Sequence, residues 1–273
     1  MIIKQWLYST IAKLNELSVP TARLDAEVLL ADLLGKDRSW LHAHPDYTLQ
    51  RSDLCKLEEQ VARRVDGEPI AYIIGKKEFY GRDFMVNKGV LVPRPESESF
   101  IELLMELNND KSVPGFLHQV LDMGTGSGCL AVTVKLENPS LKVFATDISK
   151  KALTVAEQNA RKHEVEIRFK VQSLLDGDEI RYDIILANLP YVPEDMKHIS
   201  IQKEPREALY SGIDGLDHYR RLFNQLESKR VKIKYILTES LIKQHAEVEN
   251  LATVTGYILK DTSGLVQLFM KLS

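Results

Sequence analysis

Four consecutive residues, Asn188, Leu189, Pro190 and Tyr191, could bind a planar NH2 group. The apolar run at 182–186 (YDIIL) precedes them and has the length and β-branching of a buried strand. Because proline cannot donate to a sheet ladder, the strand must stop and a stiff loop must follow. An asparagine side-chain oxygen, a proline backbone oxygen and an aromatic face can then hold an NH2 group and present its nitrogen to an electrophile. The alternative is a proline-rich turn with a packed tyrosine, and the upstream sequence bears on that choice.

A glycine-rich turn lies upstream, where another predicted strand meets a helix. Its residues are Gly124, Thr125, Gly126, Ser127 and Gly128. Glycines allow positive φ and let a ligand approach the backbone closely. Their G-x-G-x-G spacing differs from the G-x-G-x-x-G of dinucleotide-binding proteins. Asp147 lies at the end of the next predicted strand, where an acid can accept hydrogen bonds from both hydroxyls of a ribose. The turn and Asp147 together could serve a nicotinamide dinucleotide or S-adenosylmethionine.

The loop at 188–191 distinguishes these two cofactors. A hydride-transfer enzyme needs no NH2 clamp, whereas a methyltransferase acting on nitrogen does, because an amide or exocyclic amine nitrogen has a delocalised lone pair and is a poor nucleophile. Oxygens of Asn188 and Pro190 can hold both N–H bonds and stabilise positive charge on the nitrogen, while Tyr191 orients the planar group. We therefore predict that Asn188, Pro190 and Tyr191 are the catalytic residues of an S-adenosylmethionine-dependent methyltransferase. We predict no metal site, because this reaction needs no metal.

Strands and helices alternate from residue 119 onward, which predicts an α/β fold with a mostly parallel, doubly wound sheet. After the strand that precedes the glycine turn, further strands are predicted at 142–149, 167–173, 182–188 and 235–240, with helices at 150–162 and 216–228. Two last strands, at 253–259 and 264–272, predict a carboxyl-terminal hairpin. Ligands of such sheets bind at the carboxyl ends of the strands, where the glycine turn, Asp147 and Asn188 all fall.

Residues 1–74 show helical periodicity and predict a small bundle. Apolar residues recur at helical spacing in 6–14, a second helix begins after Pro20 and stops near Gly35, and a third runs over 52–65. Short β-like runs then predict a linking hairpin: Ile73–Ile74, Phe79–Tyr80 and Phe84–Val86. We therefore divide the chain into three parts: a helical docking domain at 1–74, a hairpin linker at 75–95 and a catalytic domain at 96–273.

The composition is that of an ordinary globular protein. The chain has 273 residues, a formal net charge of −3 and a pI near 6.2, which argues against bulk electrostatic capture of nucleic acid. Cys55 and Cys129 are far apart without metal-ligand spacing, as expected of free thiols in a reducing compartment. No secretory signal and no stretch of roughly 20 apolar residues is present. We expect a cytoplasmic protein that binds neither membrane nor nucleic acid directly.

With these motifs in place, the chain resembles the PrmC/HemK-type protein-(glutamine-N5) methyltransferases, which methylate the glutamine of the Gly-Gly-Gln motif in class 1 peptide chain release factors. The resemblance covers nearly the whole chain. It is carried by TARLDAEVLLADLLGKDRSWLHAHPD at 21–46, GEPIAYIIGKKEFYG at 67–81, LVPRPESE at 91–98 and EPREALYSGIDGLDHYRRL at 204–222. It implies a Rossmann-like S-adenosylmethionine-dependent methyltransferase domain, a helical amino-terminal domain that docks the release factor, and a connecting β-hairpin.

The resemblance also implies roles for individual residues. Residues 124–128 would wrap the methionine part of the cofactor, Asp147 would hold its ribose, and Arg94 with Glu96 would wall its site. The substrate amide would be bound by Asn188, Leu189, Pro190 and Tyr191, with Asn188 also near the cofactor. The sequence departs from the family at Leu189, where a proline is usual, and at Leu174 and Leu175, where an acid and a bulky residue usually lie near the adenine.

Two other functions remain open at this point. The first is an adenine-N6 methyltransferase on DNA or RNA, which would use the same clamp on the same kind of NH2 group. The second is a degenerate methyltransferase domain that acts as a binding module, which Leu174, Leu175 and Leu189 motivate. The acidic net charge argues against the first, and the intact Asp147 and Asn188 argue against the second.

Overall fold

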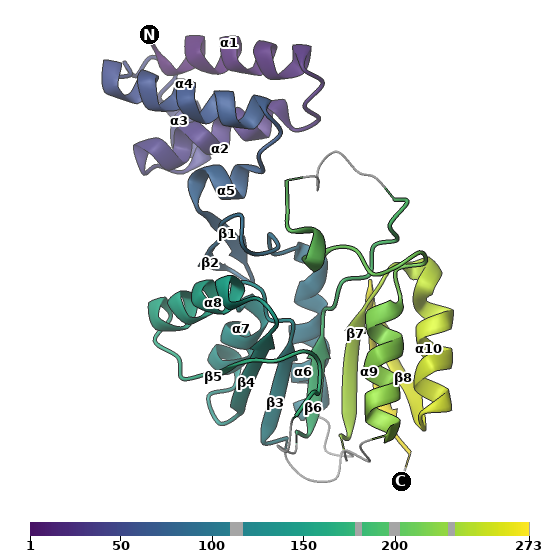
Figure 1. Ribbon diagram of the computed structural model, residues 1–273. Coiled ribbons are helices and arrows are strands. Elements are labelled where there is room, and N and C mark those ends of the chain that lie inside the picture. Colours follow the sequence, from purple (N-terminus) through teal and green to yellow (C-terminus); the bar gives the residue numbers. More distant parts are fainter. Residues whose placement is uncertain (110–116, 178–181, 197–202, 229–232, 273) are drawn as a thin grey trace. The chain divides into compact units, whose positions relative to one another are not determined.

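The structure is a computed structural model that describes residues 1–109, 117–177, 182–196, 203–228 and 233–272. Its contacts divide the chain into two compact units (Figure 1), the first holding Met1–Gly75 and the second beginning at Lys76. Each unit has its own buried apolar core. The three domain limits proposed from the sequence stay predictions.

The first unit is helical, as predicted. Its helices are α1 (Ile3–Glu16), α2 (Ala22–Leu34), α3 (Arg38–Ala43), α4 (Arg51–Val65) and α5 (Ile70–Ile74). Leu29, Leu30, Leu41 and Leu57 are almost fully buried and form the centre of its core. Gly35 ends α2 with φ of +62°, as its expected role as a helix stop requires. The periodicity of apolar residues was thus sufficient to predict the three longer helices from the sequence.

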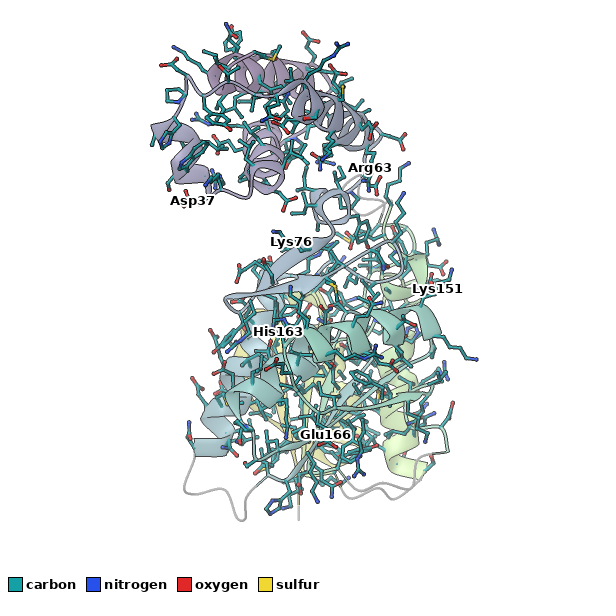
Figure 2. All side chains as sticks on the ribbon, turned by 90° about the vertical axis from the view of Figure 1, so that its left-hand side faces the viewer. Asp37, Arg63, Lys76, Lys151, His163 and Glu166 are labelled. Carbon is teal, nitrogen blue, oxygen red and sulfur yellow. The ribbon has the colours of Figure 1, made fainter. Side chains whose placement is uncertain are left out.

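Two short helices of this unit were not predicted. Helix α3 begins after Asp37, whose side chain accepts a hydrogen bond from Trp40 N at 2.7 Å (Figure 2). Helix α5 contains Ile73 and Ile74, so their assignment as a β-like run was wrong. A pair of β-branched residues carries no period, and here Ile73 packs into the helical core. The secondary structure of segments this short depends on the residues against which they pack.

The second unit is built on a seven-stranded sheet, and the predicted doubly wound α/β fold is confirmed. The strands are β3 (Gln119–Met123), β4 (Lys142–Asp147), β5 (Arg168–Val171), β6 (Ile184–Ala187), β7 (Tyr235–Glu239), β8 (Tyr257–Ser263) and β9 (Val266–Lys271). Their order is β5-β4-β3-β6-β7-β9-β8. The first five pair in parallel, while β9 is antiparallel to both β7 and β8.

Helices cover both faces of the sheet (Figure 1). Ile184 and Leu186 of β6 pack with α6 (Ser99–Asn109) and α7 (Cys129–Glu137), whereas Ile185 and Ala187 pack with the opposite helices α9 (Asp217–Ser228) and α10 (His245–Val254). This alternation explains why β6 reads as a continuous apolar run. No helix in the described part of the chain is long and apolar enough to cross a membrane.

One boundary near the end of the chain differs from expectation. The predicted strand at 253–259 begins only at Tyr257, because Thr253 and Val254 complete α10. Val248 and Ala252 are fully buried one helical turn apart, and this packing extends the helix across two β-branched residues. The predicted carboxyl-terminal hairpin of β8 and β9 is otherwise confirmed.

A two-stranded hairpin precedes the sheet, as predicted. Strands β1 (Lys76–Phe79) and β2 (Arg82–Met85) are antiparallel, and β2 packs on α8 (Lys150–Lys162). Asn159 of α8 donates to Met85 O at 2.9 Å and accepts from Met85 N at 2.7 Å. His163, which is labelled in Figure 2, directly follows α8, and its ring lies 4.9 Å from the Phe84 ring. These contacts hold the hairpin against α8 within the second unit.

The strand order reverses direction at β3 and β6, and this is where the predicted motifs meet. Met123 at the end of β3 is paired with Ala187 at the end of β6. Gly124 and Asn188 therefore leave neighbouring strands at the same height. In open α/β sheets such a switch point is the usual ligand site.

Candidate active site

A cavity lies at this carboxyl edge of the sheet, within the second unit. The predicted site residues that line it are Gly124, Gly126, Asp147, Asn188, Leu189 and Pro190. The structure therefore brings the glycine turn, Asp147 and the loop at 188–191 (the asparagine loop) around one space. A cofactor held by the first two would lie beside a group held by the third.

The glycines of the turn have two different structural roles. Gly124 and Gly126 face the cavity, whereas Gly128 has φ of +79° and packs against α8, where a Cβ would stand 3.0 Å from Ala156 Cβ. Gly128 is therefore required for helix packing. Thr125 and Ser127 are buried and, with Gly128, are outside the set of described residues that line the cavity. Cofactor roles for these three residues stay predictions.

Beneath the turn, Asp122 supports its conformation. Its Oδ2 atom accepts hydrogen bonds from Thr125 Oγ1 at 2.6 Å and from Ala131 N at 3.1 Å. Asp122 is 1% exposed. Burial raises the pKa of Asp122 to about 7, although the two hydrogen bonds oppose that shift. This carboxyl is thus a structural support whose charge changes near neutral pH.

Asp147 is the last residue of β4 and is oriented by the backbone around it. Gly126 N donates to its Oδ2 at 3.0 Å, and Ser149 N donates to its Oδ1 at 2.8 Å. Burial raises the pKa of Asp147, while these backbone donors lower it. Each oxygen keeps a further lone pair for a ligand hydroxyl. The geometry suits a carboxylate that binds a ribose from the wall of the cavity.

The asparagine loop follows β6 directly. Leu189 is 4% exposed and belongs to the buried core beside the sheet, so the residue that departs from the family pattern is anchored by packing. The single hydroxyl hydrogen of Tyr219 lies between Ala187 O, at 2.9 Å from the hydroxyl oxygen, and Glu239 O, and so links the ends of β6 and β7. The loop therefore begins from a fixed point.

Tyr191 is held through its hydroxyl, which donates to Glu239 Oε1 at 2.8 Å. Burial raises the pKa of Tyr191 far above its ordinary value, and the charge of Glu239 raises it further. Tyr191 therefore remains protonated at any physiological pH. It can orient a planar group but does not act as a base.

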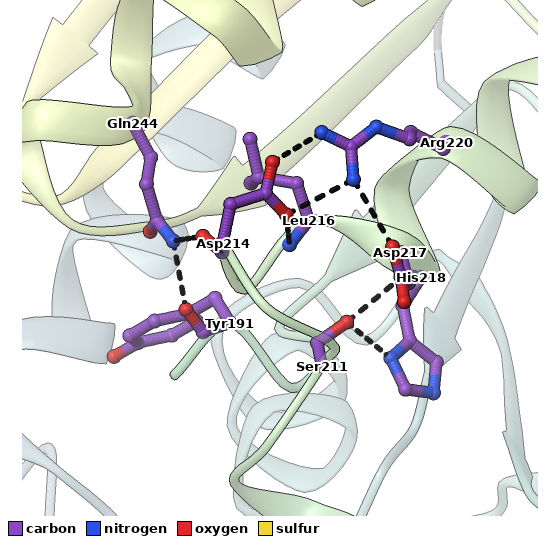
Figure 3. Close-up of polar contacts among 8 residues, drawn as sticks. All are labelled: Tyr191, Ser211, Asp214, Leu216, Asp217, His218, Arg220 and Gln244. Atoms are coloured by element: carbon purple, nitrogen blue, oxygen red, sulfur yellow. Dashed lines mark hydrogen bonds and ion pairs between the residues drawn. The ribbon is translucent and has the colours of Figure 1, made fainter. Parts of the chain in front are cut away.

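Gln244 and the loop at 211–215 together brace the asparagine loop (Figure 3). The Gln244 side chain donates through Nε2 to Tyr191 O at 2.9 Å and to Asp214 O at 2.7 Å. Ser211 Oγ, in the loop at 211–215, accepts from His218 N at 3.0 Å and lies 2.6 Å from His218 Nδ1. The backbone oxygen of Tyr191, at the end of the asparagine loop, thus has a fixed position.

The other side of the cavity holds residues that the sequence analysis did not assign. His218 and Arg221 line it from one face of α9, and Arg221 Nη2 donates to Ser173 Oγ at 3.3 Å. Leu174 also lines it, with φ of +48°, whereas Leu175 is buried in the core. Of the two leucines at the family's adenine positions, Leu174 alone is on the cavity wall.

The arginine–proline–glutamate segment makes its described contacts away from the cavity lining, and its role at the cofactor site stays a prediction. Arg94 pairs with Glu204, whose other oxygen accepts from Val92 N at 3.0 Å. Within the described lining of the cavity, Arg94 and Glu96 are absent. Arg94 instead joins the segment before α6 to the segment after the asparagine loop. This ion pair is partly buried.

Two residues near the asparagine loop were missed by sequence analysis, Ser97 and Glu239. Ser97 belongs to the segment 91–98 that carries the resemblance, and Glu239 is an acid at the carboxyl end of a predicted strand. Glu239 follows an apolar run just as Asp147 does, and this was the signal by which the sequence could have marked it.

Comparison with known families separates the chain into two matched parts. Residues 5–75 match the family described as PrmC N-terminal domain, and residues 101–205 match the family described as methyltransferase small domain. Among solved structures, a methyltransferase from Pyrococcus furiosus has a TM-score of 0.52 at 18% identity, over 78% of this chain and 98% of that one. That likeness supports the fold.

Curated relatives have a higher sequence identity to this chain. The release factor glutamine methyltransferase of Koribacter versatilis is 41% identical over 83% of this chain and 81% of its own length. The protein of the same name from Bacillus subtilis is 40% identical over 88% of this chain and 87% of its own length. Relatives at this identity cover more than four fifths of this chain and of their own length, and the chain therefore belongs to the release factor glutamine methyltransferase family.

Proposed function

We propose that this protein transfers a methyl group from S-adenosylmethionine to the side-chain amide nitrogen of the glutamine in the Gly-Gly-Gln motif of class 1 peptide chain release factors. The observation that carries the proposal is the meeting of Asn188 with Gly124, Gly126 and Asp147 around one cavity. An NH2 clamp beside a nucleoside site is the arrangement that methyl transfer to an amide nitrogen requires.

The site fits S-adenosylmethionine, which is the cofactor of this family. The Asp147 carboxylate, held by two backbone N–H groups, is positioned to accept from the ribose hydroxyls. Gly124 and Gly126 leave room at the cavity wall for the methionine part. When bound, the cofactor supplies an electrophilic methyl group on its sulfonium.

The protein's own groups prepare the nucleophile. The Asn188 Oδ1 and Pro190 backbone oxygens accept the two N–H bonds of the substrate amide, and the Tyr191 ring orients its plane. Both acceptors favour a more tetrahedral nitrogen and stabilise the positive charge that develops on it. Alignment supplies much of the remaining rate. Leu189 keeps the loop in place from the core side, so the departure from the family pattern is compatible with activity.

The partner is a release factor, and the helical unit is the part we assign to its docking. We place the reaction in the cytoplasm and assign no direct contact with nucleic acid. Membership of a family of glutamine methyltransferases favours this substrate over an adenine NH2 group. The intact Asn188, Pro190 and Tyr191 favour an enzyme over a binding module.

The deciding experiment is mass spectrometry of a purified class 1 release factor after incubation with this protein and S-adenosylmethionine. We expect one added methyl group on the Gly-Gly-Gln glutamine. The Asn188→Ala variant should lose at least about 100-fold in kcat, since one acceptor of the developing charge is gone, with cofactor affinity changed only modestly. Absence of methylation, with an active control enzyme on the same release factor, would refute the proposal. Calorimetry with the cofactor would then separate another NH2 substrate from a binding module.

A further inference from the structure

A buried carboxylate lies directly behind the asparagine loop. Glu239 ends β7, is 1% exposed, and accepts one hydroxyl on each oxygen. Ser97 Oγ donates to Oε2 at 2.6 Å, and Tyr191 OH donates to Oε1 at 2.8 Å. Burial raises the pKa of Glu239, and these two donors counteract the shift. A buried acid with dedicated donors on both oxygens has a specific structural purpose.

The Ser97 hydroxyl links Glu239 to Asn188 through two hydrogen bonds of defined direction. A serine hydroxyl has one hydrogen, and here that hydrogen is used by Glu239. The Ser97 oxygen can therefore only accept from its other neighbour, Asn188 Nδ2, at 2.9 Å. The Asn188 amide also contributes a hydrogen bond that lowers the pKa of Glu239. Both contacts require that the NH2 end of Asn188 faces Ser97 and Glu239.

This requirement settles an ambiguity that shape cannot. The two ends of a carboxamide have nearly the same size, so packing alone permits either orientation. With its NH2 end toward Ser97, Asn188 keeps its oxygen available to accept a hydrogen bond. With the opposite orientation, it would turn an NH2 group toward the NH2 group of the substrate, donor against donor.

We propose that Glu239 and Ser97 are positioning residues that fix the orientation of the Asn188 amide, so that Asn188 Oδ1 accepts from the substrate NH2 group. The proposal rests on the clamp role given to Asn188 under the proposed function. Glu239 at the same time holds Tyr191 through its hydroxyl, so one buried acid orders both side chains of the loop. Neither Ser97 nor Glu239 touches the substrate in this scheme.

The test compares Ser97→Ala, Ser97→Thr and Glu239→Gln in the release-factor methylation assay. Ser97→Ala removes the acceptor for Asn188 Nδ2, and Glu239→Gln keeps the shape but introduces a donor. We expect kcat to fall about 10- to 100-fold in both, with the Kd for S-adenosylmethionine within threefold of the unaltered protein. Ser97→Thr retains a hydroxyl and should keep kcat within about fivefold. Ser263→Ala, which removes a partly buried hydroxyl bonded to Ser99 at 3.2 Å, is the matched control and should leave kcat unchanged.

A double-mutant cycle separates positioning from a general structural effect. Because Ser97 acts through Asn188, Ser97→Ala should cause no further loss in an Asn188→Ala background, measured in single turnovers with labelled cofactor. A further loss equal to that of Ser97→Ala alone would overturn the proposal. So would a folded Ser97→Ala variant with kcat within threefold of the unaltered protein. If Asn188→Ala is inactive while these variants are normal, the positioning role fails and the proposed function stands; if the unaltered protein transfers no methyl group, the proposed function itself fails.

Discussion

Substitution of Gly215 by alanine should displace the catalytic loop without touching the cofactor site. Gly215 has φ of +83°, and a Cβ there would stand 2.1 Å from Tyr191 O and 2.5 Å from Gln244 Nε2. Real Cβ atoms do not approach closer than 3.0 Å, so the contact with Tyr191 O must open by about 0.9 Å. Leu216, the next residue, is 2% exposed and anchored in the core. The displacement must therefore pass largely to Tyr191 and the Gln244 brace (Figure 3).

The size of the kinetic effect follows from this displacement. A misplacement of about 1 Å at a positioning element costs on the order of 100-fold in rate, or about 2.7 kcal/mol of transition-state stabilisation. We expect Gly215→Ala to lower kcat for release-factor methylation by about that factor. The Kd for S-adenosylmethionine, measured by calorimetry, should stay within threefold, because Gly124 follows β3 and Asp147 ends β4, neither of them in contact with the added Cβ.

Gly81→Ala provides the matched control. Gly81 has φ of +72°, and a Cβ there would meet no atom within 4 Å. It therefore carries the conformational penalty of positive φ, about 1 kcal/mol of stability, without the clash. Its kcat should equal that of the unaltered protein. A folded Gly215→Ala variant whose kcat also lies within threefold would refute the argument that the loop at 211–215 fixes Tyr191.

Two further predictions concern the cofactor side of the site. Asp147→Ala removes two charge-assisted acceptors, each contributing about 1.5–3 kcal/mol, so the Kd for S-adenosylmethionine should rise at least about 100-fold in calorimetry; a change below threefold would reject the ribose assignment. Asp122 has its folded-state pKa raised from 3.8 to about 7, so its stabilising contribution is complete below pH 4 and is lost as pH rises toward 7. Relative to the unaltered protein, Asp122→Asn should therefore gain up to about 1.4 kcal/mol of unfolding free energy per pH unit in that window, measured by urea denaturation, and parallel pH profiles would contradict it.

The sequence by itself determined the family, the α/β fold and the places of the predicted site residues at the ends of strands. Asp147 and Asn188 each follow an apolar run, and the glycine turn follows another, so their places at strand ends could be recognised locally. Parallel strands have their carboxyl ends at one edge of a sheet, and this rule alone brings the three motifs together. The register of Met123 against Ala187 shows how directly that rule applies here.

Tertiary structure alone decided the contacts between distant segments. Ser97 and Glu239 are 142 residues apart, and no local pattern specifies that the hydroxyl of one donates to the other. The same holds for Gln244, which braces the asparagine loop from a separate turn. Periodicity also could not resolve α5 or choose which of Leu174 and Leu175 faces the cavity. Local sequence fixes which backbone conformations are favoured, whereas the direction of a side chain and its hydrogen-bond partner depend on segments that meet only after the chain has folded.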